Sequence, residues 1–150
     1  MSKSLSLAAV VLLIVSTFAL AGSCEQTAQD LVSKGVIHIK AVGAKQAAAD
    51  FMDPDGEFID GDYYLLFYTF DGNCLALGAK PEVAGKNRWN VHDPDGVYQI
   101  REMVNLAKMG GGWVEYKYAN PSTGKVQPKK TYVRPVPNMD AFVGCGIYYK

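Results

Sequence analysis

The sequence predicts an α+β domain: a five-stranded antiparallel sheet with a long N-terminal helix on one face and a helical crossover over the other. Apolar residues recur at helical spacing from Glu25 to about Phe51, without a proline. Five later segments alternate in the manner of strands and are separated by turn-forming residues. Because a single antiparallel sheet cannot bury both faces alone, the helix and the connection between its second and third strands are expected to cover them.

The chain begins MSKSLSLAAVVLLIVSTFALAGSC, with a cationic start at Lys3 followed by a long apolar run. This pattern is typical of a secretory signal peptide, so we expect residues 1–23 to be removed and residues 25–150 to form a single domain. An uncleaved membrane anchor is an alternative, because the run approaches the length of a membrane-spanning helix. The sequence up to Cys24 also loosely resembles a lipobox, which makes lipid anchoring there a further alternative. We expect a periplasmic or otherwise extracytoplasmic protein.

The composition limits the function classes. The chain has 150 residues, 49% hydrophobic and 20% charged, as expected for one globular domain. Loss of the leader would remove Lys3 and leave one more acidic than basic residue. Nucleic-acid binding needs a net basic face, so no nucleic-acid partner is expected. The three cysteines, Cys24, Cys74 and Cys145, include no C-x-x-C pair, which indicates neither a zinc site nor haem attachment.

The first half of the domain follows from the turn formers. We expect the long helix to break near Gly43 and to end at the turn-rich segment Met52–Asp62. Tyr63–Phe70 then reads as a strand, and Cys74–Ala79 reads as its hairpin partner across Asp-Gly-Asn.

The second half begins with the long connection Lys80–Gly112. It contains irregular turns and then VYQIREMVNLAKM, whose apolar residues fall on one helical face before three glycines. Three more strands are expected, over Trp113–Ala119, Lys130–Val136 and Ala141–Tyr149. An irregular connection over a sheet tends to leave a cleft, where small ligands bind.

Several spaced motifs agree in order with one known family. The run from GEFIDGDYYLLFYTFDGNCLALGAKPEVAGKN through HDPDGVYQIREMVNLAKMGGGWVEYKYANPSTGKVQPKKTYVRPV to VGCGIYYK resembles the single Cache domain family, type 2, of extracytoplasmic bacterial sensors, over about residues 28–150. The resemblance implies a PAS-like fold with strand order 2-1-5-4-3 and a pocket for a small organic acid. In that order Cys74 and Cys145 lie about two strand spacings of ~4.8 Å apart, so we expect free, buried thiols. Relatives commonly carry a His where this chain has Leu77.

Strand alternation selects the candidate pocket residues. We assign the face of the last strand that carries two glycines to the pocket, and the Cys145 face to the long helix; the alternative is that the glycines only admit the crossover helix. A buried carboxylate needs a cation and phenol or indole donors. Lys130 and Tyr132 supply both on one face. The alternative for each aromatic residue is plain cross-strand packing, and the alternative for each lysine is a solvated position at the edge of the sheet. The full set of candidate ligand-binding residues is Tyr64, Tyr68, Arg88, Trp89, Arg101, Trp113, Tyr116, Lys130, Tyr132, Gly144 and Gly146.

No catalytic pattern is recognisable. There is no nucleophile elbow, phosphate loop or pair of catalytic carboxylates. The two Asp-Pro-Asp-Gly segments lack the closing Glu of a calcium loop and read as turns. We therefore expect a non-enzyme without cofactor or metal, and an enzyme using His92 and Asp93 is only a remote alternative.

The expected function is that of an exported sensor for a short organic acid. The chain stops just after the last strand, so we expect it to report through a partner such as a membrane sensor kinase or chemoreceptor. The alternative is a structural module of the same fold that binds no ligand and forms a homodimer through its N-terminal helix.

Overall fold

The computed structural model describes residues 6–149, and it describes side chains from Gly22 onward. The predicted signal peptide, residues 1–23, lies almost entirely outside the described side chains. Within residues 22–149, whose side chains the structure describes, no helical segment combines the length and the apolar character needed to cross a membrane.

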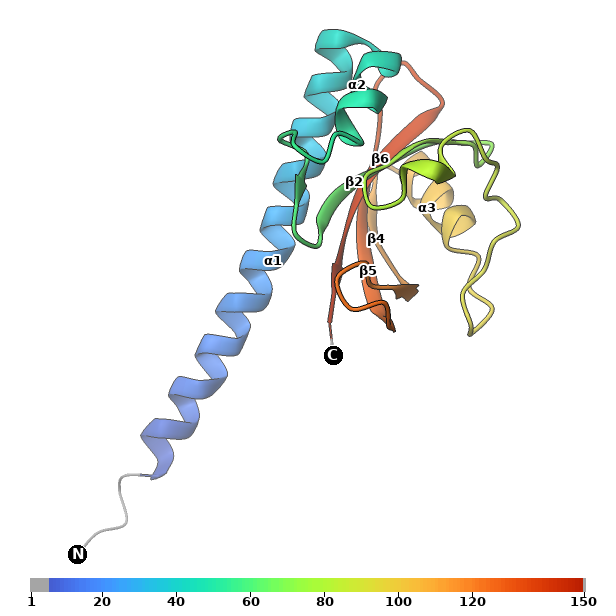
Figure 1. Ribbon diagram of the computed structural model, residues 1–150. Coiled ribbons are helices and arrows are strands. Elements are labelled where there is room, and N and C mark those ends of the chain that lie inside the picture. Colours follow the sequence, from blue (N-terminus) through green and yellow to red (C-terminus); the bar gives the residue numbers. More distant parts are fainter. Residues whose placement is uncertain (1–5, 150) are drawn as a thin grey trace, which may run out of the picture.

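One long helix, α1 (Ser6–Val42), packs along the sheet and projects beyond it at its N-terminal end (Figure 1). Its path ends at Gly43, whose φ of 86° lies in the left-handed region that favours glycine. A shorter helix, α2 (Ala44–Phe51), then turns back over the end of the sheet. The predicted break near Gly43 is therefore confirmed, since the two helices meet at this residue.

The sheet is antiparallel, and its strands follow the order β3-β2-β6-β5-β4, with the two-residue β1 pairing the other end of β2. This is the predicted order 2-1-5-4-3 with one short strand added. The bounds of the strands are β1 (Ile59–Asp60), β2 (Tyr63–Thr69), β3 (Cys74–Leu77), β4 (Gly112–Ala119), β5 (Val126–Pro135) and β6 (Ala141–Tyr148).

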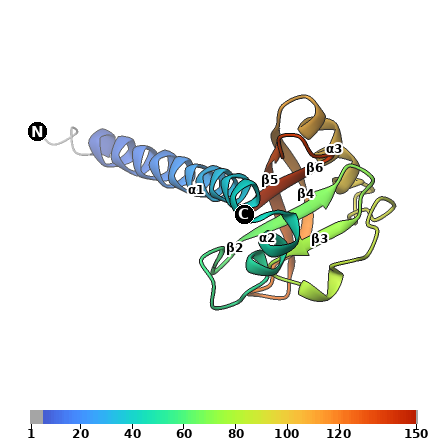
Figure 2. The same ribbon diagram turned by 90° about the horizontal axis from the view of Figure 1, so that it is seen from above.

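The connection from β3 to β4 crosses the face of the sheet opposite α1. It contains a short 3₁₀ turn, η1 (Pro81–Val83), and the helix α3 (Gln99–Lys108). Figure 1 shows α1 and α3 on opposite sides of the sheet, and Figure 2 shows the same arrangement from above. The predicted layering of helix, sheet and crossover is confirmed.

Each face of the sheet has its own hydrophobic core. The α1 face packs around Val32, Phe51, Leu65 and Val143, together with Cys145. The other face packs the apolar side of α3 against the sheet and includes Cys74. Both of these cysteines are buried and free, as expected.

Candidate functional site

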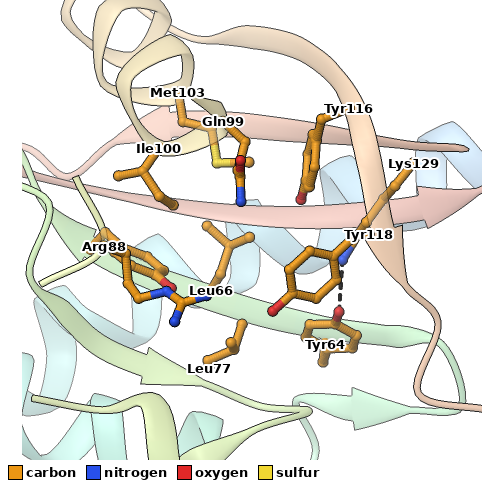
Figure 3. Close-up of a pocket in the computed structure, with 11 residues that line it drawn as sticks. Tyr64, Leu66, Leu77, Arg88, Gln99, Ile100, Met103, Tyr116, Tyr118 and Lys129 are labelled. Carbon is orange, nitrogen blue, oxygen red and sulfur yellow. Dashed lines mark hydrogen bonds between the residues drawn. The ribbon is translucent and has the colours of Figure 1, made fainter. Parts of the chain in front are cut away.

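Polar side chains interrupt the second core between the sheet and the segment that crosses it. We call residues 80–98, the irregular part of that segment, the lid. The cavity beneath is lined by Tyr64, Leu66, Tyr68, Leu77, Arg88, Gln99, Ile100, Met103, Tyr116, Tyr118 and Lys129 (Figure 3). It measures about 20 Å³, close to the room that one water molecule requires. A larger occupant therefore needs the lining side chains to move apart.

Lys129 is the cation of this cavity. Its side chain is 1% exposed, and its Nζ donates a hydrogen bond of 2.7 Å to the hydroxyl of Tyr64. Nζ also lies over three tyrosine rings, at 4.5 Å from the centroid of Tyr64, 4.8 Å from Tyr148 and 5.1 Å from Tyr118. Among the described residues no carboxylate pairs with it within 4.0 Å, as ion pairs elsewhere in the chain do. A buried ammonium ion without an anion is costly, so this lysine either loses its proton or takes an anionic partner.

The register of β5 explains why Lys129 points inward. Lys129 pairs with Tyr116 on β4 and with Tyr148 on β6, and paired residues of an antiparallel sheet share a face. Gly146 makes the space, because a Cβ there would lie 2.0 Å from Lys129 Cε. The strand begins at Val126 and not at Lys130 as expected, so Lys129 belongs to the regular alternation of the strand.

Burial controls the charge states around this lysine. It lowers the pKa of Lys129 to about 7 and raises the pKa values of Tyr64 and Tyr116 well above that of an ordinary phenol. Both phenols therefore keep their protons and remain able to donate. The Tyr116 hydroxyl lies 2.9 Å from Thr131 Oγ1, which fixes its ring at the cavity wall.

Two further polar groups approach from the lid and from α3. Figure 3 shows Arg88 entering the cavity from the side opposite Lys129, and the amide of Gln99 pointing into the space between them. Gln99 is the first residue of α3, and its buried Oε1 has no hydrogen-bond partner among the described residues. Buried polar atoms without partners are rare in folded proteins, which makes this oxygen a candidate contact for a hydroxyl donor.

The lid is held in place by several polar contacts. Arg101 Nε donates to the backbone oxygen of Trp89 at 2.9 Å, and its guanidinium lies 4.1 Å from the Tyr98 ring centroid. Asp93 is buried, and although burial opposes its ionisation, backbone N–H donors from Lys117, Val97 and Asp95 hold its pKa below the usual value. The second Asp-Pro-Asp-Gly segment thus serves as a turn that ties the lid to β4.

Six of the candidate residues lie on the cavity side of the sheet. Tyr64, Tyr68, Arg88 and Tyr116 line the cavity. Gly144 and Gly146 lie beneath its wall, against Leu66 and Lys129 respectively. Leu77 is also a lining residue, so an apolar side chain stands where the family resemblance implies a His.

The other five candidates lie elsewhere, which corrects their expected placement. Lys130 pairs with Glu25 of α1 on the opposite face. Tyr132 and Trp113 pack together on that same face, with ring centroids 5.3 Å apart. The physical reason is strand alternation: the face that holds Lys129 cannot hold its neighbour.

The remaining two are Trp89 of the lid and Arg101 of α3, whose guanidinium lies 5.5 Å from the Trp89 ring centroid. Arg101 donates to the backbone of the lid and not toward the sheet, so both residues fix the lid.

The sequence reasoning missed Lys129, Tyr118 and Gln99. Lys129 and Lys130 are adjacent, and both alternating sets of the hairpin contain cations and aromatics, so composition does not separate the faces. The pairing between strands separates the two faces. Gly146 pairs with Thr131, which places the odd-numbered residues of β5 on the glycine face. No sequence signal marked Gln99, whose role depends on where α3 begins.

The sequence of this domain matches one known protein family. The model of single Cache domain 2 matches residues 21–150, which is nearly the whole domain. The chain belongs to this family. Single Cache domains are extracytoplasmic or periplasmic sensor domains, so the domain is a Cache sensor domain, and the family is not a catalytic one.

Two curated relatives are similar over part of the domain. The sensor histidine kinase MctS of Rhizobium johnstonii is 36% identical over 87 residues, which is 58% of this chain and 19% of that protein. The methyl-accepting chemotaxis protein CtpM of Pseudomonas aeruginosa is 32% identical over 87 residues, 57% of this chain and 16% of its own length. The chain thus spans less than a fifth of either relative.

Solved structures show the same fold. A methyl-accepting chemotaxis protein from Vibrio parahaemolyticus superposes with a TM-score of 0.77 at 22% identity, covering 91% of this chain and 95% of that one. A Cache chemosensory domain described as recognising carboxylic acids gives a TM-score of 0.71 at 20% identity, covering 88% and 97%. At these identities the likeness concerns the fold.

Proposed function

We propose that this Cache domain binds a short carboxylate beneath its lid, with Lys129 as the group that pairs the acid's charge. The observation that carries the proposal is a fully buried lysine side chain with phenol neighbours and no carboxylate partner among the described residues. A carboxylate beside Nζ would supply the missing anion, and Tyr64 is placed to donate to it. The carboxylic acid named for one structural neighbour agrees with this choice of ligand class.

The size of the cavity limits the ligand. A space of about 20 Å³ favours acids with two or three carbons, and even these require the wall to yield. Arg88 and Tyr118 are the two lining residues that are only partly buried, so they are the side chains that move most easily. Arg88 then supplies a second positive charge from above.

Binding is tested by thermal shift with formate, acetate, propionate, pyruvate and lactate. A ligand that binds only the folded protein raises the melting temperature according to its concentration over Kd. We expect at least one acid to do so for the natural protein and for Lys130→Met, and none to do so for Lys129→Met. The two substitutions remove neighbouring lysines from opposite faces of one strand. Equal shifts in both variants would remove Lys129 from the site.

Signalling by this domain also belongs to the proposal. The relatives are receptors with kinase or chemotaxis functions, so we propose that a membrane sensor kinase or chemoreceptor receives the signal. The protein is proposed to work outside the cytoplasm, after signal-peptide removal or with a lipid at Cys24. Intact-mass measurement of the exported protein distinguishes these two forms.

The small cavity and the apolar Leu77 favour a second candidate, a dimerising module that binds no ligand. Ile37 on the outer side of α1 is 69% exposed, which offers one apolar contact for a homodimer. Native mass spectrometry separates the candidates: a retained small acid supports the sensor, whereas a tight dimer without bound metabolite supports the module.

A further inference from the structure

We propose that the cavity takes up one proton together with its carboxylate, so that the domain responds jointly to acid concentration and to pH. The inference rests on the proposed function, since it concerns the same cavity and the same lysine. At alkaline pH, the form of the empty site that accepts the acid, with Lys129 protonated, is the minor form.

The geometry around Lys129 favours a neutral amine when no anion is bound. An ammonium group has three donors, and the described residues accept one of them, through the Tyr64 hydroxyl. The rest of the surroundings are ring faces, alkyl groups and the backbone near Gly146, which solvate a charge less well than water.

The groups that face Lys129 from each element leave its charge uncompensated. β2 presents Tyr64, β6 presents Tyr148, and β4 presents Tyr116 and Tyr118. Cys145 lies on the α1 face of β6 and acts on Lys129 only through the sheet. Burial raises the pKa of Tyr148 and of Cys145 to about 12, so both stay neutral at physiological pH.

The nearest formal charges do not change this balance. Asp62, in the turn before β2, accepts a hydrogen bond from Ser122 and acts on Lys129 only at long range. Lys80, at the start of the lid, is itself positive and disfavours a second charge. Arg88 and Gln99 complete the lid side, and neither supplies an anion.

The resulting reaction is a simple proton uptake. Above pH 7, where burial holds the pKa of Lys129, the empty site contains the free amine. A carboxylate entering beside Nζ stabilises the protonated form, so a proton from solvent adds to the nitrogen lone pair as the ion pair forms. No bond in the ligand breaks, and the complex carries one more proton than its separated parts.

The test is calorimetric titration of the purified protein with pyruvate and with lactate from pH 6 to pH 9. Both acids stay ionised across this range, so the protein alone supplies any pH dependence. Treating the protonated fraction as the binding-competent fraction, we expect the affinity to fall roughly 100-fold over the range. Paired titrations in phosphate and Tris buffers, which differ in ionisation enthalpy, are expected to report about half a proton taken up at pH 7 and nearly one at pH 8.5.

Two variants assign the proton. Lys130→Met, altered on the other face of β5, is expected to keep the pH dependence. Lys129→Arg keeps its charge at every pH tested, so where this variant binds acid its affinity is expected to be flat with pH. Acid binding by the natural protein with no buffer-dependent heat and a pH-independent Kd would overturn the inference and leave carboxylate binding intact. No acid binding at any pH would overturn both.

Discussion

Replacing Lys129 with Met is expected to make the empty protein more stable, although it removes a hydrogen bond and several ring contacts. Burial shifts the pKa of Lys129 from 10.5 to about 7. Each pKa unit corresponds to about 1.4 kcal/mol, so keeping this lysine protonated in the fold costs about 5 kcal/mol. Contacts such as the 2.7 Å bond to Tyr64 return part of that cost, about 1–2 kcal/mol. The net gain expected from Met at pH 6 is therefore about 3–4 kcal/mol, in the range seen when apolar residues replace buried ions.

The sign of the pH dependence follows from the same shift. Between pH 7 and pH 10.5 the unfolded lysine is protonated and the folded one is not, so the natural protein becomes more stable as pH rises. The stability of Lys129→Met does not change with pH in this way. The excess of its free energy of unfolding over that of the natural protein is therefore expected to shrink by about 2–3 kcal/mol between pH 6 and pH 9.

Urea unfolding at pH 6 and at pH 9 measures the stability gain of Lys129→Met and its change with pH, provided that the dependence of the unfolding free energy on urea concentration is the same in both proteins. Lys130→Met is the matched control. It breaks a partly exposed pair with Glu25, so we expect a change of under about 1 kcal/mol that is similar at both pH values. A Met variant less stable than the natural protein at pH 6, or a difference that does not change with pH, would show that Lys129 is not a costly buried base.

Two other substitutions test the shape and polarity of the cavity. Gly146→Ala places a Cβ 2.0 Å from Lys129 Cε and 2.7 Å from Thr131 Oγ1. We therefore expect the free energy of unfolding in urea to fall by about 1–3 kcal/mol, and no acid to raise the melting temperature of this variant. A variant as stable as the natural protein would mean that the lysine is free to move aside. Gln99→Met removes the unpartnered amide oxygen while keeping the length of the side chain. We expect it to weaken lactate, which carries a hydroxyl donor, by about tenfold relative to propionate in calorimetry, whereas equal effects on both acids would exclude a specific contact.

The architecture was largely readable from the sequence because local signals agreed with one another. Turn residues such as those around Gly43 and Gly72 separated segments whose alternation or helical spacing was clear. The strand order came from the family resemblance, and the structure bears it out.

The site was only partly readable because it depends on register and on where elements begin. A shift of one residue in β5 exchanges Lys129 for Lys130, and both alternating sets of that hairpin are chemically plausible walls. The pairing of Thr131 with Gly146 decides between them, and Pro128 conceals the start of β5 at Val126 from propensity arguments. The loss of solvent around Lys129 arises from tyrosine rings of three strands, Tyr64, Tyr118 and Tyr148, which come together only in the folded sheet and which no local pattern encodes.

The most direct measurement is the ¹⁵Nζ resonance of Lys129 in lysine-labelled protein, assigned by its absence in Lys129→Met. With pyruvate or lactate added at pH 8, we predict that this resonance moves from the position of a neutral amine to that of an ammonium ion, while the Lys130 resonance stays in place. An acid that binds by calorimetry and leaves the Lys129 signal unmoved would contradict the assignment of this buried lysine as the group that holds the carboxylate.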